Sequence, residues 1–143
     1  MNSAATVHAS AAIVGGRGVL IRGASGSGKS SLLLSLLDRD PDAMLVADDR
    51  VHLAAENGRL VATVPEAIAG QMEIRGVGIV RRPYVAQTAI DLVVDLVPLA
   101  ESPRLPDEKE EWVTLEDVSL RQIFVAAGAH DGAARVRAAL AFL

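Results

Sequence analysis

The stretch Gly23-Ala24-Ser25-Gly26-Ser27-Gly28-Lys29-Ser30 decides the fold expected for this chain. It fits the pattern G-x-x-x-x-G-K-[ST] at every fixed position. The preceding run, Gly18-Val19-Leu20-Ile21-Arg22, is apolar and typical of a buried strand. The following run, residues 31–38, is rich in leucine, contains neither Gly nor Pro, and is typical of a helix. A glycine loop between a strand and a helix is the context that this motif requires, so we predict a phosphate-binding loop here.

The residue types in this loop suit the chemistry of nucleotide binding. Glycines let successive backbone N–H groups turn toward one centre, and the start of the helix adds its positive end to the same point. Lys29 supplies a mobile charge for the β- and γ-phosphates, and the hydroxyl of Ser30 is placed to ligate Mg²⁺. We therefore expect ATP and Mg²⁺ as cofactors. The residues expected to bind the nucleotide are Gly23, Ala24, Ser25, Gly26, Ser27, Gly28, Lys29 and Ser30.

Composition narrows the class of protein. A chain of 143 residues is large enough for one domain with a real core, and half of its residues are hydrophobic. Its formal net charge of −4 argues against nonspecific nucleic-acid binding, which needs a basic surface. It contains no cysteine, no apolar stretch long enough for a membrane span and no pattern of a signal peptide. We expect a cytoplasmic protein that binds neither nucleic acid nor membrane.

Periodicity and turn residues predict the other elements of a mixed α/β fold. Residues 5–14 and 18–21 suggest a hairpin that leads into the loop. His8 lies in its first strand, where a lone histidine is usually structural. Asn57-Gly58 predicts the turn of a second hairpin within residues 51–64. The remaining expected elements are a short helix over 65–70, strands over 71–80, 90–97, 112–115 and 120–126, a surface loop over 100–111, and a final helix over 131–143 with Asp131 near its cap.

Two adjacent carboxylates, Asp48 and Asp49, follow an apolar run over residues 44–47 that predicts a buried strand. An aspartate at the end of such a strand, shortly after a phosphate loop, can hold Mg²⁺. Adjacent strand residues point to opposite faces, so one carboxylate could serve the metal and the other a substrate hydroxyl. The alternative is a solvated acidic turn.

The segment over residues 71–80 places Glu73 and Arg75 on one face of an expected strand by alternation. Gly76 and Gly78 leave the backbone bare, which permits a ligand or another strand to approach closely. These residues alone leave two interpretations open, an edge strand or part of a site.

Three separated pieces of the sequence together resemble one enzyme family. They are the glycine loop, Ala47-Asp48-Asp49-Arg50-Val51, and Met72-Glu73-Ile74-Arg75-Gly76-Val77-Gly78-Ile79-Val80. In combination they are similar to the catalytic domain of bacterial HPr kinase/phosphorylase, which phosphorylates a serine of the small phosphocarrier protein HPr. The resemblance covers most of residues 5–105. It implies a P-loop kinase-type mixed β-sheet core with flanking helices, organised as one catalytic domain over 1–143. The chain resembles the short alphaproteobacterial form, which lacks the usual N-terminal domain of the family.

The resemblance also implies roles for single residues. Lys29 would contact the phosphates and Ser30 the Mg²⁺. Asp49 matches the acid/base residue, which would accept the proton of the attacking serine, and Glu73 matches a second Mg²⁺ ligand. The remaining matches are His8, at the position of an active-site histidine, and Arg104, which resembles a catalytic arginine. With Asp48, the expected metal ligands are therefore Ser30, Asp48 and Glu73.

Beyond residue 105 the sequence departs from the family. Long members carry a loop of the V-R-P-G-R-N type that is tied to removal of the phosphate. Here the nearest stretch, residues 119–124, has one arginine and no Pro-Gly pair. The resemblance thus implies a Mg-dependent protein-serine kinase that acts on an HPr-like phosphocarrier and regulates the phosphotransferase system, and it leaves phosphorylase activity and a homo-oligomer open. Two alternatives are a nucleotide-dependent regulatory binding module with little turnover and a small-molecule P-loop kinase.

Overall fold

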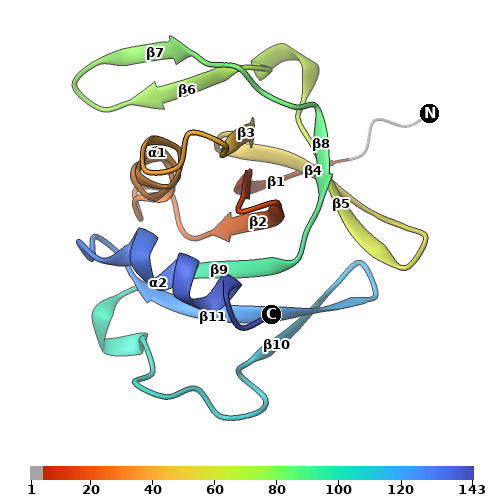
Figure 1. Ribbon diagram of the computed structural model, residues 1–143, viewed down its shortest axis with the longest axis vertical. Coiled ribbons are helices and arrows are strands. Elements are labelled where there is room, and N and C mark those ends of the chain that lie inside the picture. Colours follow the sequence, from red (N-terminus) through yellow and green to blue (C-terminus); the bar gives the residue numbers. More distant parts are fainter. Residues whose placement is uncertain (1–4) are drawn as a thin grey trace.

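The computed structural model describes residues 5–143 and shows a mixed α/β fold built on one large sheet (Figure 1). The sheet has nine strands in the order β10-β11-β9-β2-β1-β4-β5-β8, with β3 paired to β1 beside this path. Strands β6 and β7 form a separate two-stranded sheet. The strands are β1 (Thr6–Val14), β2 (Arg17–Arg22), β3 (Met44–Ala47), β4 (Arg50–Glu56), β5 (Arg59–Thr63), β6 (Gln71–Ile74), β7 (Gly78–Arg81), β8 (Gln87–Ala89), β9 (Leu92–Val97), β10 (Trp112–Leu115) and β11 (Val118–Ala126).

Two α-helices cover one face of the sheet. Helix α1 (Lys29–Asp38) follows β2, and helix α2 (Gly132–Leu140) follows β11. Strands β2, β9 and β11 are parallel neighbours, so both helices begin at the same end of these strands. Leucines of α1 and Val136 of α2 pack with side chains of the three strands into one aliphatic cluster. This packing fixes the position of the glycine loop between β2 and α1 (Figure 1).

The face of the sheet opposite the helices is covered by other strands of the same sheet. Strands β4, β5 and β8 continue the sheet beyond β1, and apolar residues of β4 and β5 share a second core cluster with β2, β9 and β11. Strand β8 approaches β2 closely at Gly18, where an added Cβ would lie 1.8 Å from the carbonyl oxygen of Ala89. Only glycine fits there, because any side chain would collide with backbone.

The fold class predicted from the sequence is confirmed. The two predicted hairpins are also confirmed, β1–β2 before the glycine loop in the sequence and β4–β5 after it. The predicted short helix is the 3₁₀ turn η1 (Glu66–Ile68), and a second one, η2 (Leu99–Glu101), overlaps the start of the surface loop predicted over 100–111. No helix in the described part of the chain has both the length and the apolar character needed to cross a membrane.

One local prediction was wrong. Residues 71–80 are a hairpin and not one strand, because the chain turns between Ile74 and Gly78, with the N–H of Val77 bound to the carbonyl of Ile74 at 2.9 Å. Glu73 and Arg75 therefore do not share a strand face. Asp131 is the N-cap residue of α2, as predicted, but its carboxylate caps no backbone N–H and instead accepts a hydrogen bond from Nε of Arg135 at 2.9 Å.

The packing at Gly18 yields a prediction. Gly18→Ala should lower the free energy of unfolding by about 1–3 kcal/mol or more, because the new methyl group collides with rigid backbone. A urea titration measures this change. Gly132→Ala is the matched control, since its Cβ would meet only side-chain methyl groups, those of Leu32 at 3.2 Å and Val125 at 3.5 Å, and we expect a change within about 1 kcal/mol. Equal stability of Gly18→Ala and wild type would contradict the close packing of Gly18 against the backbone of Ala89.

Candidate active site

The glycine loop leaves β2 at Arg22 and enters α1 at Lys29. Gly26 and Gly28 have φ values of 81° and 99°, in the left-handed region that favours glycine. The N–H of Ser27 turns inward and donates to the carbonyl of Ala24 at 3.0 Å. The first N–H groups of a helix lack intrahelical acceptors, so the start of α1 presents free donors at the loop. This arrangement can bind an anion.

The base of the loop is tied to the sheet by a polar bridge. Arg22, the last residue of β2, donates from Nε and Nη2 to the two carboxylate oxygens of Asp95 on β9, at 2.7 and 2.8 Å. Asp95 also accepts a hydrogen bond from Gln122 on β11. Three parallel strands are thereby cross-linked directly below Gly23. Sequence reasoning missed this bridge because its partners are at least 27 residues apart.

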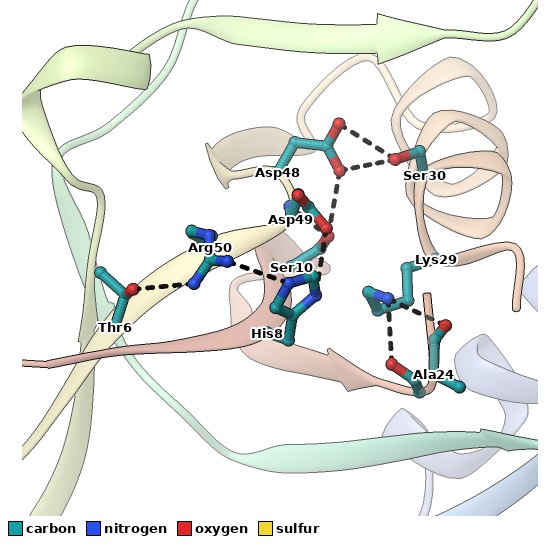
Figure 2. Close-up of polar contacts among 10 residues, drawn as sticks. Thr6, His8, Ser10, Ala24, Lys29, Ser30, Asp48, Asp49 and Arg50 are labelled. Carbon is teal, nitrogen blue, oxygen red and sulfur yellow. Dashed lines mark hydrogen bonds and ion pairs between the residues drawn. The ribbon is translucent and has the colours of Figure 1, made fainter. Parts of the chain in front are cut away.

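Lys29 is almost fully buried, with 5% of its surface exposed. Its Nζ donates to the carbonyl oxygens of Gly23 and Ala24 at 3.0 and 3.2 Å (Figure 2). Both acceptors belong to the loop itself, so the ammonium group is held inside the curve of the backbone. A cation at this point adds to the positive end of α1 and favours a multiply charged anion.

Asp48 is the buried carboxylate of the site, with 6% of its surface exposed. It accepts hydrogen bonds from Oγ of Ser30 at 2.8 and 3.0 Å, from Oγ of Ser10 at 3.0 Å and from the N–H of Glu73 at 3.3 Å. All three donor groups are neutral, and within residues 5–143 no Lys, Arg or His side chain forms an ion pair with Asp48. A buried carboxylate with neutral partners and an adjacent hydroxyl fits a divalent cation.

Asp49 lies in a different environment from its neighbour. Its backbone has φ of 71° in the bend between β3, which ends at Ala47, and β4, which begins at Arg50, and its side chain lies toward His8. The Asp49 side chain is 59% exposed. Its N–H donates to Oγ of Ser10 at 2.9 Å, so Ser10 contacts both aspartates (Figure 2). One carboxylate is available to a buried cation and the other to a solvent-side partner.

His8 lies between Asp49 and Arg50. Its Nδ1 is 3.5 Å from Oδ1 of Asp49, and its Nε2 is 3.2 Å from Nη2 of Arg50. A guanidinium can only donate, so Nε2 must accept the Arg50 hydrogen bond, and the neutral ring then carries its proton on Nδ1, facing Asp49. Arg50 is held in turn by Oγ1 of Thr6 at 3.3 Å.

A cleft of about 790 Å³ opens over the glycine loop. The β6–β7 hairpin lies above α1 in Figure 1 and contributes Glu73, Ile74 and Arg75 to the lining. The loop, the start of α1 and the two aspartates contribute the rest. The charged lining residues are Lys29, Arg75, Asp48, Asp49 and Glu73, a formal net charge of −1.

The structure brings most of the predicted site residues to this cleft. Those from the loop that line it are Ser25, Gly26, Gly28, Lys29 and Ser30. Arg104 is exposed in the loop after η2 and does not line the cleft, so its catalytic role stays a prediction. Glu73 approaches Asp48 through its backbone, and no group of three or more Asp, Glu or His side chains placed to hold a metal occurs within residues 5–143. The metal role of Glu73 likewise stays a prediction.

Sequence reasoning missed two residues that shape the site, Ser10 and Arg50. The signal for Ser10 was available, because its hydroxyl stands among alanines and lies on the same strand face as His8, two residues earlier. Arg50 could not be linked to His8 from the sequence, since their contact depends on the pairing of β1 with β4.

The double contact of Ser10 yields a prediction. Ser10→Ala should lower the free energy of unfolding by about 1–3 kcal/mol, because the N–H of Asp49 loses its acceptor and Asp48 loses a donor. A shift of the urea midpoint with an unchanged slope would show it. Ser35→Ala, on the exposed side of α1, is the control and should change stability by less than about 0.5 kcal/mol. An equally small effect at Ser10 would mean that these hydrogen bonds contribute nothing net.

Comparisons with known proteins identify the family to which the chain belongs. The family model described as "HPr Serine kinase C-terminal domain" matches residues 1–135. An HPr kinase/phosphorylase of Mycoplasma mycoides is 31% identical over 134 residues, which cover 85% of this chain and 42% of that protein. One of Geobacillus sp. is 38% identical over 130 residues, 83% of this chain and 41% of that protein.

A solved structure agrees with these matches. The Hpr(Ser) kinase/phosphatase from Coxiella burnetii superposes with a TM-score of 0.81 at 27% identity, covering 96% of this chain and 95% of that one. The chain spans less than half the length of the curated relatives above. The predicted resemblance is confirmed, and the chain belongs to the HPr serine kinase C-terminal domain family.

Proposed function

We propose that this chain is an ATP-dependent protein-serine kinase that phosphorylates an HPr-like phosphocarrier protein, with Mg²⁺ as the metal. The observation that carries the proposal is the placement of Asp49 beside the Ser30–Asp48 pair at the mouth of the glycine loop. An anion site, a cation site and a free carboxylate then share one cleft. Family membership supports the kinase class, and the serine acceptor and the phosphotransferase role are inferences from the names of the relatives.

The loop and Lys29 bind and orient the phosphates of ATP in this proposal. Phosphoryl transfer requires little covalent help from a protein and depends on positioning and charge neutralisation. Ser30 and Asp48 would hold Mg²⁺, with Glu73 as a further ligand. When bound, Mg²⁺ neutralises the charge that develops on the phosphate oxygens.

Asp49 acts as the general base. It accepts the proton of the acceptor serine hydroxyl as the serine oxygen forms its bond to the γ-phosphorus, and the bond from that phosphorus to the bridging oxygen breaks to release ADP. Its exposure suits this task, since the acceptor belongs to a second protein that must reach it from solvent. His8, with its proton on Nδ1, donates toward Asp49 and orients its carboxylate, while Arg50 fixes the histidine.

A regulatory binding module with little turnover is the second candidate. Two observations favour it. The V-R-P-G-R-N type of loop is absent from residues 119–124, and Arg104 lies outside the cleft. Incubation with γ-labelled ATP, Mg²⁺ and HPr-like proteins of the host, followed by mapping of the labelled residue, separates the candidates. Labelled serine on the carrier supports the kinase, whereas nucleotide binding without transfer supports the module.

We expect Lys29→Ala to abolish ATP binding and transfer together. Lys29 is the only cation that the loop supplies, and loss of a charge-assisted phosphate contact weakens binding by about 1.5–3 kcal/mol at least. Calorimetric titration with ATP measures this effect. Arg135→Ala, in the exposed part of α2, is the matched loss of one positive charge and should bind ATP like wild type. Unchanged ATP affinity and transfer in Lys29→Ala would refute the phosphate role of the loop.

The two aspartates should respond differently to the same isosteric change. Asp49→Asn should slow serine phosphorylation by about 10²–10⁴-fold with little change in ATP affinity, because it removes general-base help alone. Asp48→Asn should instead raise the Mg²⁺ concentration needed for activity or lower stability, since its carboxylate is buried among three donor groups. Transfer rates, ATP binding and Mg²⁺ titrations on both variants decide this. A near wild-type rate for Asp49→Asn would remove it from the base role.

A further inference from the structure

A second hollow, of about 360 Å³, lies at the end of the sheet opposite the glycine loop. Strand β2 connects the two regions, because Arg17 at its start lines the hollow and Arg22 at its end leads into the loop. The β4–β5 and β10–β11 hairpin turns, which border the hollow, lie on the right of Figure 1, away from α1. No residue lines both the hollow and the cleft.

The hollow is positively charged on an acidic protein. Three arginines line it from three different strands: Arg17 from β2, Arg59 from β5 and Arg121 from β11. Asp91 is its only acidic lining residue, so the lining carries a formal net charge of +2, whereas the whole chain carries −4. The cleft over the glycine loop carries −1, so the two sites differ in sign.

Asp91 does not neutralise all three arginines. Its Oδ1 accepts from Arg59 at 2.6 Å, and its Oδ2 accepts from the N–H of Gly18 at 3.0 Å, so both oxygens are engaged. This pairing cross-links β5, β2 and the start of β9 into a fixed wall. Within residues 5–143, Arg17 forms no side-chain hydrogen bond or ion pair.

Arg121 is held in position and also keeps donors free. Its guanidinium lies 5.3 Å from the centre of the Trp112 ring, and its nearest acid is Glu111 at 3.9 Å. Its Nε is buried and has no hydrogen-bond partner among the described residues, so the donors open to a ligand are the terminal Nη groups of this 38% exposed side chain. A planar guanidinium with unused donors is suited to phosphate or carboxylate.

Trp112 gives the hollow an apolar wall. It is 51% exposed, although burial of an indole normally stabilises a folded protein or a complex. A volume of about 360 Å³ admits only a small molecule. The expected ligand therefore combines an anionic group for the arginines with a short apolar body for Trp112.

We propose that this hollow is a binding site for a small organic anion, a phosphate monoester or a carboxylate, held by Arg17 and Arg121 against Trp112. The site is independent of the proposed kinase reaction, and binding can be measured without ATP or a carrier protein.

Trp112 is the single tryptophan of the chain, so its fluorescence reports on the hollow. The probes are n-butyl phosphate and hexanoate, with 1-hexanol as the uncharged control. We expect a saturable change with at least one anion, half-saturated on the order of 1 mM, and none with the alcohol. A response to the phosphate alone, the carboxylate alone or both identifies the ligand class and supports the site. No saturable response to either anion, or an equal response to 1-hexanol, overturns it.

Variants test the arginines. Arg17→Ala should raise the half-saturating concentration at least about tenfold, and Arg17→Lys should recover part of that loss. The cation that lies over the Trp112 ring is Arg121, which this variant keeps, so the unliganded fluorescence should stay the same. Arg135→Ala, outside the hollow, should bind the probe like wild type. An equal loss in Arg135→Ala, or no loss in Arg17→Ala, would overturn the proposal. Calorimetry on wild type gives an independent reading.

Discussion

The site depends on the burial of one carboxylate, that of Asp48. Burying a charge is unfavourable unless hydrogen bonds or an opposite charge compensate it. Here β1 supplies Ser10, α1 supplies Ser30 and β6 supplies the N–H of Glu73, so three separate elements converge on one side chain. The same contacts join the glycine loop, the strand pair β1–β3 and the β6–β7 hairpin. Because all the donors are neutral, the negative charge remains available to a cation.

The polarity of the central strands explains why the chain has two different anion-attracting regions. At the carboxyl end of β2, an anion is attracted by backbone N–H groups, the start of α1 and one lysine, with carboxylates close by for a metal. At the amino end of β2 none of the described helices begins, and the attraction that we propose there comes from arginine side chains. The first arrangement suits a metal-bound polyphosphate and the second a small anion without a metal.

How much of the fold and of the site could be predicted depends on how far apart in the sequence the contacting residues lie. The glycine loop, its strand and its helix are local in sequence, and they were placed correctly because each has its own pattern of residues. The pattern over residues 71–80 predicts one strand where the structure has the β6–β7 hairpin, because the alternation continues through the turn at Arg75 and Val77. The bridge from Arg22 to Asp95 spans 73 residues and follows only from the order of strands in the sheet.

The separation of Asp48 and Asp49 shows how local backbone geometry can divide two identical side chains between tasks. In a continuing strand the two would point to opposite faces, and both faces of this sheet are buried. Strand β3 ends at Ala47 instead, and Asp49 in the following bend has φ of 71°, a left-handed conformation that aspartate tolerates better than most residues. The hydrogen bond from its N–H to Ser10 helps to stabilise this turn. The strained residue is thus the one proposed as the base, and the turn brings its carboxylate to solvent, where a protein substrate can reach it.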